Sequence, residues 1–217
     1  TGSMILGHQT TGTLNNAQYN TAVGINAMDA LTHGDHNTAV GHDALTSNDL
    51  GKDNAAYGFR ALYSNMEGDS NVAVGYYALL DNTYGDSNTA VGDSSLNNNT
   101  TGGKNTALGE FSLASNTTAG SSTAVGYKAL QNATGDSNTA MGFQAGDVIT
   151  SGRANIIIGE NSDPSAADTH YEIVIGAGAT GKGTHKAVIG SNSTTDVYMS
   201  QDMGATVHAD GVKFYED

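Results

Sequence analysis

The sequence contains no cysteine and no tryptophan, and it has a single proline. Without cysteine the chain forms neither disulfides nor a thiolate metal site. Apolar runs are short as well, and none approaches the roughly 20 residues that a membrane-spanning helix needs. We therefore expect a chain that does not rely on covalent cross-links and does not insert into a membrane.

Basic residues are scarce too. Eight Lys and Arg stand against 22 Asp and Glu, which gives a formal net charge of −14. Nucleic-acid-binding proteins use basic stripes to displace the counterions of phosphate groups. Nucleic acid is therefore not an expected partner, and the acidic side chains are expected to form a solvated surface that keeps the protein soluble.

Hydrophobic residues make up only 37% of the 217 residues, a content that can indicate disorder. A strict repeat argues against disorder, because the phrase Asn-Thr-Ala-Val-Gly returns at a fixed interval. Its closing glycines are Gly24, Gly41, Gly58, Gly75, Gly92, Gly109, Gly126 and Gly142, followed by Gly159, Gly176 and Gly190. The steps are 17 residues, except for 16 into Gly142 and 14 into Gly190. Such a period indicates a repeat array, which buries a thin continuous core by stacking.

Two columns of different size precede the glycines. A bulky residue, mostly valine, stands one position before each glycine, as Val23 does. Alanine stands two positions before it, at Ala22, Ala39, Ala56, Ala73, Ala90, Ala107, Ala124 and Ala140. Neighbouring strand residues point to opposite faces. We expect the bulky column to fill the inside of a coil, and the alanine column to face a place where another backbone comes close.

A second segment follows each glycine, with a pair such as Ala44-Leu45 three and four residues later. This pair predicts a second strand and a second core column. An asparagine column comes next, at Asn48, Asn65, Asn82, Asn99, Asn116 and Asn132, whose side chains suit turns and could bond to stacked copies. Each period therefore reads as strand, corner, strand, corner. The sequence predicts an all-β parallel β-solenoid of about eleven coils, on the order of 50 Å long.

The phrase Asn-x-Ala-Val-Gly, with Ala-Leu three and four residues later and Gly-Asp closing the coil, resembles the head repeats of YadA-like trimeric adhesins and of bacteriophage tail fibres. The resemblance covers about Ile5 to Gly190. It implies a left-handed parallel β-roll, with three chains side by side about a threefold axis, so that the alanine column would be buried between chains. The coil is longer than in bacterial adhesins, with extra residues at corners such as Asn82 to Gly85, and is more similar to the phage branch.

The repeat divides the chain into three parts. Residues 1–146 form the regular array, and residues 147–190 form wider, irregular terminal coils with strands rich in β-branched residues. Residues 191–217 are expected to form a short β-hairpin that caps the array. This last part resembles the segment before the endosialidase-type chaperone domain of phage tail fibres, and that domain is not among the 217 residues.

Aromatic residues follow several repeat glycines and give the best candidate for a binding surface. The candidate receptor-binding residues are Phe59, Tyr63, Tyr76, Tyr77, Tyr84, Tyr127 and Phe143. Aromatic side chains beside Asp and Asn are typical of sugar-binding surfaces. Ordinary packing between adjacent coils or between chains is the alternative interpretation.

No set of residues predicts catalysis, a cofactor or a metal ion. His33, His36 and His42 lie close together in the sequence but stand in columns of surface residues, so we expect them to decorate the surface. Asp69, Asp86 and Asp136 follow corner glycines, where a turn-capping role is favoured over calcium binding. An enzyme needs a convergent acid, base or nucleophile, which no spacing here indicates.

We expect a non-enzymatic segment of the tail fibre of a phage or phage-like particle, located on the virion or at a cell surface. It would form a stiff homotrimeric rod and bind a host cell-surface glycan or protein. One alternative is the head domain of a bacterial trimeric autotransporter adhesin. A less favoured alternative is a polysaccharide-depolymerising tailspike, which would need a pair of carboxylates that no spacing singles out.

Overall fold

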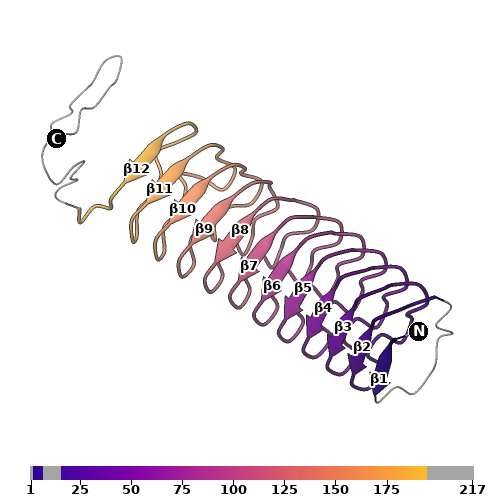
Figure 1. Cartoon of the computed structure of the whole chain (residues 1–217). Helices are drawn as coiled ribbons and strands as arrows, with labels where there is room; N and C mark the ends of the chain where they lie inside the picture. The colour runs from indigo at the N-terminus through magenta and orange to yellow at the C-terminus, as the bar shows by residue number, and fades with distance from the viewer. Residues whose placement is uncertain (1, 7–15, 195–217) are drawn as a thin grey trace, which may run out of the picture.

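The computed structural model describes residues 2–6 and 16–194, which form one elongated parallel β-solenoid. Three-residue strands lie in single file and join into one twelve-stranded sheet in chain order (Figure 1). The strands are β1 (Met4–Leu6), β2 (Thr21–Val23), β3 (Thr38–Val40), β4 (Ala55–Tyr57), β5 (Val72–Val74), β6 (Thr89–Val91), β7 (Thr106–Leu108), β8 (Thr123–Val125), β9 (Thr139–Met141), β10 (Ile156–Ile158), β11 (Ile173–Ile175) and β12 (Ala187–Ile189). No helix capable of spanning a membrane occurs in this part of the chain.

The register of the sheet confirms the predicted period. Thr21 pairs with Thr38 in parallel, one 17-residue coil later. The two irregular steps are absorbed without loss of register, because Thr123 pairs with Thr139 and Ile173 pairs with Ala187. The cap predicted for residues 191–217 lies, beyond Thr194, outside the described residues.

The predicted orientation of the strand residues is wrong. The alanine column points into the coil, where Ala39, Ala56 and Ala73 are completely buried. The bulky column points outward, and Val74 remains 37% exposed. The cause lies in the opposite wall of the coil, because leucines such as Leu62 reach across and are completely buried. The coil is so thin that only a methyl group fits between the strand and these leucines.

The predicted second strand does not form. The segment with the Ala-Leu pair is a run of turns, in which Leu45 adopts a φ of 53° and Asp43 a φ of 58°. A left-handed non-glycine residue costs about 1–2 kcal/mol, which burial of a leucine side chain, about 1.5–3 kcal/mol, offsets. Adjacent coils still bond through this wall, since the Leu45 N–H donates to the Ala61 carbonyl at 2.9 Å. The leucine column is thus a core column, as predicted, but each coil has one strand rather than two.

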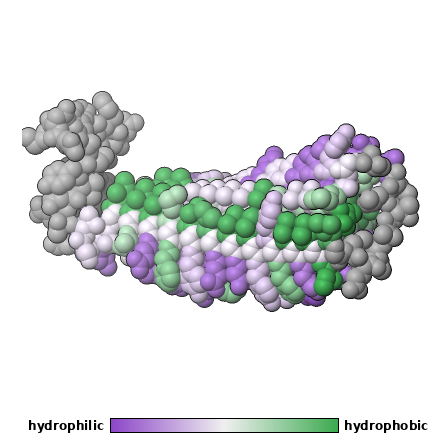
Figure 2. Space-filling model, turned by 60° about the horizontal axis from the view of Figure 1, so that its bottom comes forward, coloured by the Kyte–Doolittle hydropathy of each residue, from purple (hydrophilic) through white to green (hydrophobic). Residues whose placement is uncertain are grey.

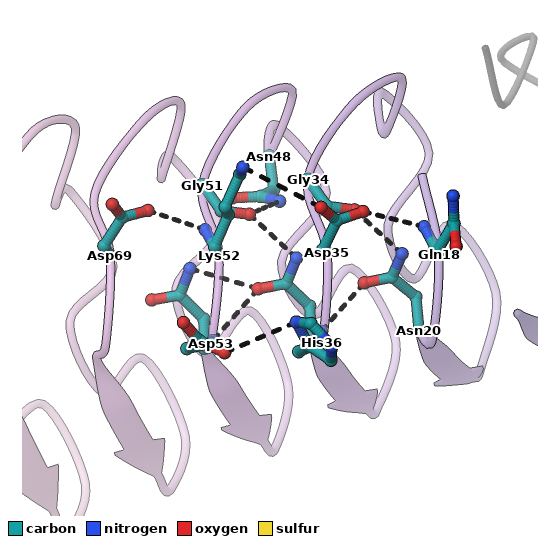
Figure 3. Close-up of polar contacts among 12 residues, drawn as sticks. Gln18, Asn20, Gly34, Asp35, His36, Asn48, Gly51, Lys52, Asp53 and Asp69 are labelled. Carbon is teal, nitrogen blue, oxygen red and sulfur yellow. Dashed lines mark hydrogen bonds and ion pairs between the residues drawn. The ribbon is translucent and has the colours of Figure 1, made fainter. Parts of the chain in front are cut away.

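Buried asparagines link the coils in two ladders. In the first, directly before each strand, the Asn37 N–H donates to Asn20 Oδ1 at 2.8 Å, and the Asn37 amide donates to the Gly51 carbonyl at 2.8 Å. Figure 3 labels Asn20 and Gly51, the two partners, in successive coils. The predicted second ladder is confirmed from Asn48 to Asn116. Its repeating contact is the Asn65 amide, which donates to Asn48 Oδ1 at 2.8 Å.

Asn132 does not belong to the second ladder, contrary to the prediction. The ladder position, 17 residues after Asn116, holds the buried Ala133, and Asn132 precedes it and is exposed. The Asn132 amide donates instead to the Asp147 carbonyl at 2.7 Å. Asn116 Oδ1 consequently has no hydrogen-bond partner among the described residues.

Glycine closes each coil because successive coils approach closely at that point. Gly75 adopts a φ of +142°, a conformation that L side chains rarely adopt. A Cβ atom on Gly75 would also lie 2.7 Å from the carbonyl carbon of Gly92 in the next coil. Backbone strain and steric contact therefore both require glycine at this column.

Candidate functional site

The outward side of the sheet carries a continuous uncharged surface, which we call the strand face. It consists of the first and third residues of β1–β12. The first positions are Met4, Thr21, Thr38, Ala55, Val72, Thr89, Thr106, Thr123, Thr139, Ile156, Ile173 and Ala187. The third positions are Leu6, Val23, Val40, Tyr57, Val74, Val91, Leu108, Val125, Met141, Ile158, Ile175 and Ile189. No charged residue interrupts either rank, although the chain has 30 charged residues, 8 basic and 22 acidic.

The strand face is exposed in the single chain. Leu108 is 47% exposed, and hydrophobic surface runs as a band along the array with hydrophilic surface beside it (Figure 2). Singly exposed hydrophobic residues are normal, whereas a long contiguous patch marks an interaction surface. Covering the exposed part of each third-position side chain would contribute on the order of 1 kcal/mol, repeated on every strand.

Four of the predicted aromatic residues form one cluster beside this face. Phe59 stacks on His42 and on Tyr76, with centroids 5.5 and 5.3 Å apart. Tyr77 packs against Tyr76 at 4.0 Å. Because the rings cover one another, their edges and hydroxyl groups remain for contact with a ligand.

Arg60 joins Tyr63 to the same cluster. Its guanidinium lies over the rings of Phe59 and Tyr63, at 5.2 and 5.1 Å from the centroids. Its Nε also donates to Asp43 Oδ2 at 3.1 Å. The charge of Arg60 is therefore balanced by a carboxylate within the cluster.

Asp43 is the acidic member of this arrangement, with a side chain only 8% exposed. Burial raises the pKa of Asp43, but hydrogen bonds from Asn26 and Arg60, together with the nearby charges of His42 and Arg60, outweigh burial and lower the pKa below its usual range. The hydrogen bond between Tyr76 and Tyr77, followed by burial, raises the pKa of Tyr76. The cluster is thus a fixed, electrically balanced aromatic surface.

The other predicted residues lie elsewhere. Tyr127 and Phe143 stack at 5.2 Å in a second, smaller group, with the Lys128 ammonium 5.3 Å from the Tyr127 ring centroid. Asp93 and Glu110 stand between the two groups in the same column. Tyr84 belongs to the corner that ends at Gly85, is 51% exposed, and makes no ring contact with the described residues.

The histidines and corner aspartates make local contacts. His36 stacks on Tyr19 at 5.1 Å, and its Nδ1 is 3.7 Å from Asp53. Asp69 Oδ1 accepts the Lys52 N–H at 2.7 Å, so this carboxylate binds the backbone of the preceding coil (Figure 3). Among residues 2–6 and 16–194, no group of three His, Asp or Glu side chains could hold a metal ion.

Sequence reasoning missed a buried carboxylate, Glu172, which takes the next position of the first asparagine ladder. Its N–H donates to Asn155 Oδ1 at 3.0 Å, and its carboxylate accepts the N–H groups of Ser165 and Gly183. Burial raises the pKa of Glu172, but the backbone and hydroxyl donors around the carboxylate outweigh burial and lower the pKa. The only signal in the sequence is a glutamate where the other coils have mostly asparagine.

Asp163, by contrast, is only partly buried, and its environment shifts the pKa in the opposite direction. Burial and the charge of Asp147 raise the pKa of Asp163. Its Oδ1 atom has no hydrogen-bond partner in the described part of the chain. The charged form of Asp163 is therefore disfavoured, whereas that of Glu172 is favoured.

No protein-family model matches the chain, and a search of curated proteins found no match. The strand face and the aromatic cluster are therefore the features of the chain that bear on its function.

Proposed function

We propose that this chain is a structural and attachment segment that works as a stiff, side-by-side homotrimer in the tail fibre of a phage or phage-like particle. The observation that carries the proposal is the strand face. A protein with a net charge of −14 keeps two full ranks of residues free of charge along its length. Such a surface suits burial against other chains.

A rod-like role is supported by the way the coils are joined. Every coil repeats the same parallel strand pairing, and both asparagine ladders add buried hydrogen bonds between successive coils. Stability in such an array is a sum over neighbouring coils, so stiffness extends along its whole length. The left-handed coil and the number three come from the resemblance to YadA-like repeats, which form threefold assemblies.

An attachment role is supported by the aromatic cluster. Phe59, Tyr76 and Tyr77 are held in place by mutual stacking and by Arg60. Rigid tyrosines offer contact area at a low cost in conformational entropy, and their hydroxyl groups can bond to the polar groups of a glycan or a protein. We assign the cluster to contact with a host surface.

Native mass tests the assembly. In light scattering on a sizing column, we expect three times the chain mass of 22.1 kDa. Val40→Asp, on the strand face, should shift the particle to the monomer, because it places a charge in the buried interface. Leu50→Asp is the matched control, since Leu50 is 42% exposed at a corner away from the strand face. A monomeric wild-type chain at micromolar concentration contradicts the proposal.

Binding to host cells or a glycan array tests attachment. Tyr76→Ala should weaken binding at least tenfold, because it removes one ring that packs against two others. Tyr84→Ala should leave binding unchanged, since Tyr84 is similarly exposed but lies apart from the cluster. Equal effects of the two substitutions would remove the cluster as the binding surface.

A further inference from the structure

An attachment role does not by itself define the chemistry of the ligand that the aromatic cluster binds. We propose that the cluster binds a saccharide without acidic groups, which packs on the open ring face of Tyr76 and donates hydroxyl hydrogen bonds to the carboxylate of Asp93. The charge of Asp93 excludes acidic saccharides. This inference rests on the attachment role proposed for the cluster.

The stack of rings ends at Tyr76. Phe59 lies between His42 and Tyr76, with ring centroids 5.5 and 5.3 Å away, so both faces of Phe59 are covered. Tyr77 is 4.0 Å from Tyr76 and also only 5.6 Å from Phe59. A ring on the far face of Tyr76 would be much farther from Phe59, so Tyr77 packs against the side of the stack. Tyr76, which is 48% exposed, therefore has one open face, directed toward the next coil.

The next coil places Asp93 at this open face. β5 and β6 pair in register, so Asp93 occupies the same position in its coil as Tyr76 does, about 4.8 Å farther along the rod. The Ser94 N–H donates to the Tyr76 carbonyl at 2.8 Å, which joins the two coils at this point. The pKa of Tyr76, raised mainly by its hydrogen bond with Tyr77, is raised further by the charge of Asp93, as expected for a carboxylate beside the ring. We call the open ring face and this carboxylate the Tyr76 platform.

The carboxylate of Asp93 is held in place and still has acceptor capacity. Its Oδ1 accepts the Ser94 hydroxyl at 2.6 Å, whereas its Oδ2 receives no hydrogen bond from the described residues. An ionised carboxylate only accepts hydrogen bonds, at about four lone-pair sites. The hydroxyl groups of a saccharide are donors that suit these sites, and the C–H groups on one side of a sugar ring pack against an aromatic face. The Tyr76 platform therefore has the two kinds of group that a saccharide subsite requires.

The small extent of the platform favours a saccharide over a folded protein. Each partner in a standard protein interface buries about 800 Å². A tyrosine side chain supplies about 150–250 Å² at most, and only one face of Tyr76 is open. A single ring face with one carboxylate beside it is comparable in extent to one sugar ring.

The charges around the platform disfavour acidic ligands. Arg60 is the permanent cation of the cluster, and its Nε already donates to Asp43 Oδ2 at 3.1 Å. Asp93, in contrast, forms no ion pair within the described residues. An acidic group on a ligand would therefore meet an uncompensated carboxylate, in a chain whose net charge is −14.

Matched pairs of saccharides test the proposed ligand class. The probes are immobilised oligosaccharides of the same linkage, one ending in a hexose and the other in the corresponding hexuronic acid, so that a carboxylate replaces one CH₂OH group. We expect the native particle to bind the hexose member of a recognised pair at least tenfold more tightly than the acidic member. Equal binding of the two members, or tighter binding of the acidic member, overturns the inference.

Substitution of Asp93 tests the origin of this preference. Asp93→Asn removes the charge but keeps an acceptor oxygen. Binding of the hexose member should stay within about threefold of wild type, while binding of the acidic member should rise several-fold. Asp93→Ala also removes the acceptor and should weaken hexose binding at least tenfold. An unchanged preference in Asp93→Asn would exclude the proposed role of this carboxylate.

Glu110→Gln is the matched control, because it makes the same change in net charge as Asp93→Asn. Glu110 is exposed and stands in the same column, one coil beyond Asp93. It lies about 10 Å along the rod from Tyr76, where salt screens much of its charge. The preference for the hexose member should therefore stay as in wild type. Equal effects of the two substitutions would mean that overall charge, rather than the platform, decides the preference, and would overturn the inference.

Binding to host cells separates this inference from the proposed attachment role. If Tyr76→Ala leaves cell binding unchanged, the attachment role of the cluster fails, and the inference fails with it. If cell binding depends on Tyr76 but no saccharide of either kind is bound, the attachment role stands, a protein is the partner, and only the saccharide inference is overturned.

Discussion

The asparagine ladders hold buried polar atoms that each need a partner. Asn82 donates to Asn65 Oδ1 at 2.8 Å and to the Gly85 carbonyl at 3.0 Å, and its own Oδ1 accepts the amide of Asn99. If the Asn82 amide is removed, two buried acceptors, Asn65 Oδ1 and the Gly85 carbonyl, each lose a donor, and the Asn99 amide loses an acceptor. The importance of one residue is therefore set by the residues in the coils before and after it.

We predict that Asn82→Ala lowers the free energy of unfolding by about 2–3 kcal/mol, because it leaves several buried polar groups unsatisfied. Asn132→Ala should change it by less than about 0.5 kcal/mol, since Asn132 is exposed and outside the ladder. Denaturant titration followed by circular dichroism measures both. Similar losses for the two variants would contradict a special role of the ladder.

Glu172 makes stability depend on pH, with a sign that follows from its environment. Its pKa in the folded chain lies below the ordinary value of 4.5, so the ionised form stabilises the fold. This contribution is fully present above the pKa of the unfolded chain and is lost as the pH falls through the lowered folded pKa.

We predict that Glu172→Gln reduces the loss of thermal stability between pH 5 and strongly acidic pH, while lowering stability at pH 7. Asp163→Asn should have the opposite effect at pH 7, because burial and Asp147 raise the pKa of Asp163 and disfavour its ionised form. The midpoint of thermal unfolding, measured for each variant between strongly acidic pH and pH 7, tests both expectations. Parallel curves for wild type and Glu172→Gln would show that this carboxylate does not contribute.

At the scale of the strand, the inward alanine determines the thickness of a coil. Ala73 is completely buried between the strand and the leucines of the opposite wall, such as Leu79. A larger side chain would push the two walls apart, and the displaced backbone would also strain the contacts with the coils on both sides.

We predict that Ala73→Val destabilises the fold by about 1–3 kcal/mol through overpacking. Ala177→Val is the control, because Ala177 is exposed after the closing glycine of β11. Thermal unfolding compares the two variants. An unchanged transition for Ala73→Val would mean that the coil has free volume at this position.

The period, the parallel sheet and the leucine column could be predicted from the sequence, because a constant spacing leaves one way to stack the coils. The direction of the strand residues could not. Alternation shows that Ala73 and Val74 face opposite ways, but the leucines of the opposite wall decide which one is buried. The segment with the Ala-Leu pair forms turns rather than the predicted second strand. Residue types alone do not indicate the left-handed backbone conformation that residues such as Leu45 adopt there.

The candidate site was predictable in part for a similar reason. Phe59 and Tyr76 were identified because each directly follows a closing glycine of the repeat. They stack because the 17-residue period places them in adjacent coils. Tyr84 carries the same side chain but occupies another corner, where no ring lies in contact among the described residues. The link from Arg60 to both Tyr63 and Asp43 depends on side-chain geometry that spacing alone does not specify.

At the scale of the whole molecule, the array should tolerate the loss of one complete coil. Each coil contacts only its neighbours, so removal of one leaves equivalent surfaces to join. Deletion of residues 76–92 connects Gly75 to Asp93, which occupies the same place in the next coil.

We predict that this deletion gives a folded particle that is about 4.8 Å shorter, with nearly unchanged thermal stability. Deletion of residues 76–83 should prevent correct stacking, because it removes about half a coil and breaks the register of every column beyond it. Small-angle scattering measures the length and circular dichroism the folding. Equal behaviour of the two deletions would contradict an array of independent coils.

The near-identity of the coils also has a mechanical consequence. If the two ends of a single chain are pulled apart, the interfaces between successive coils carry the same load and have nearly the same strength. Coils should then detach one after another from an end rather than all at once. Each event would release a 17-residue coil, or about 55–60 Å of extended chain, so the force trace should show evenly spaced peaks.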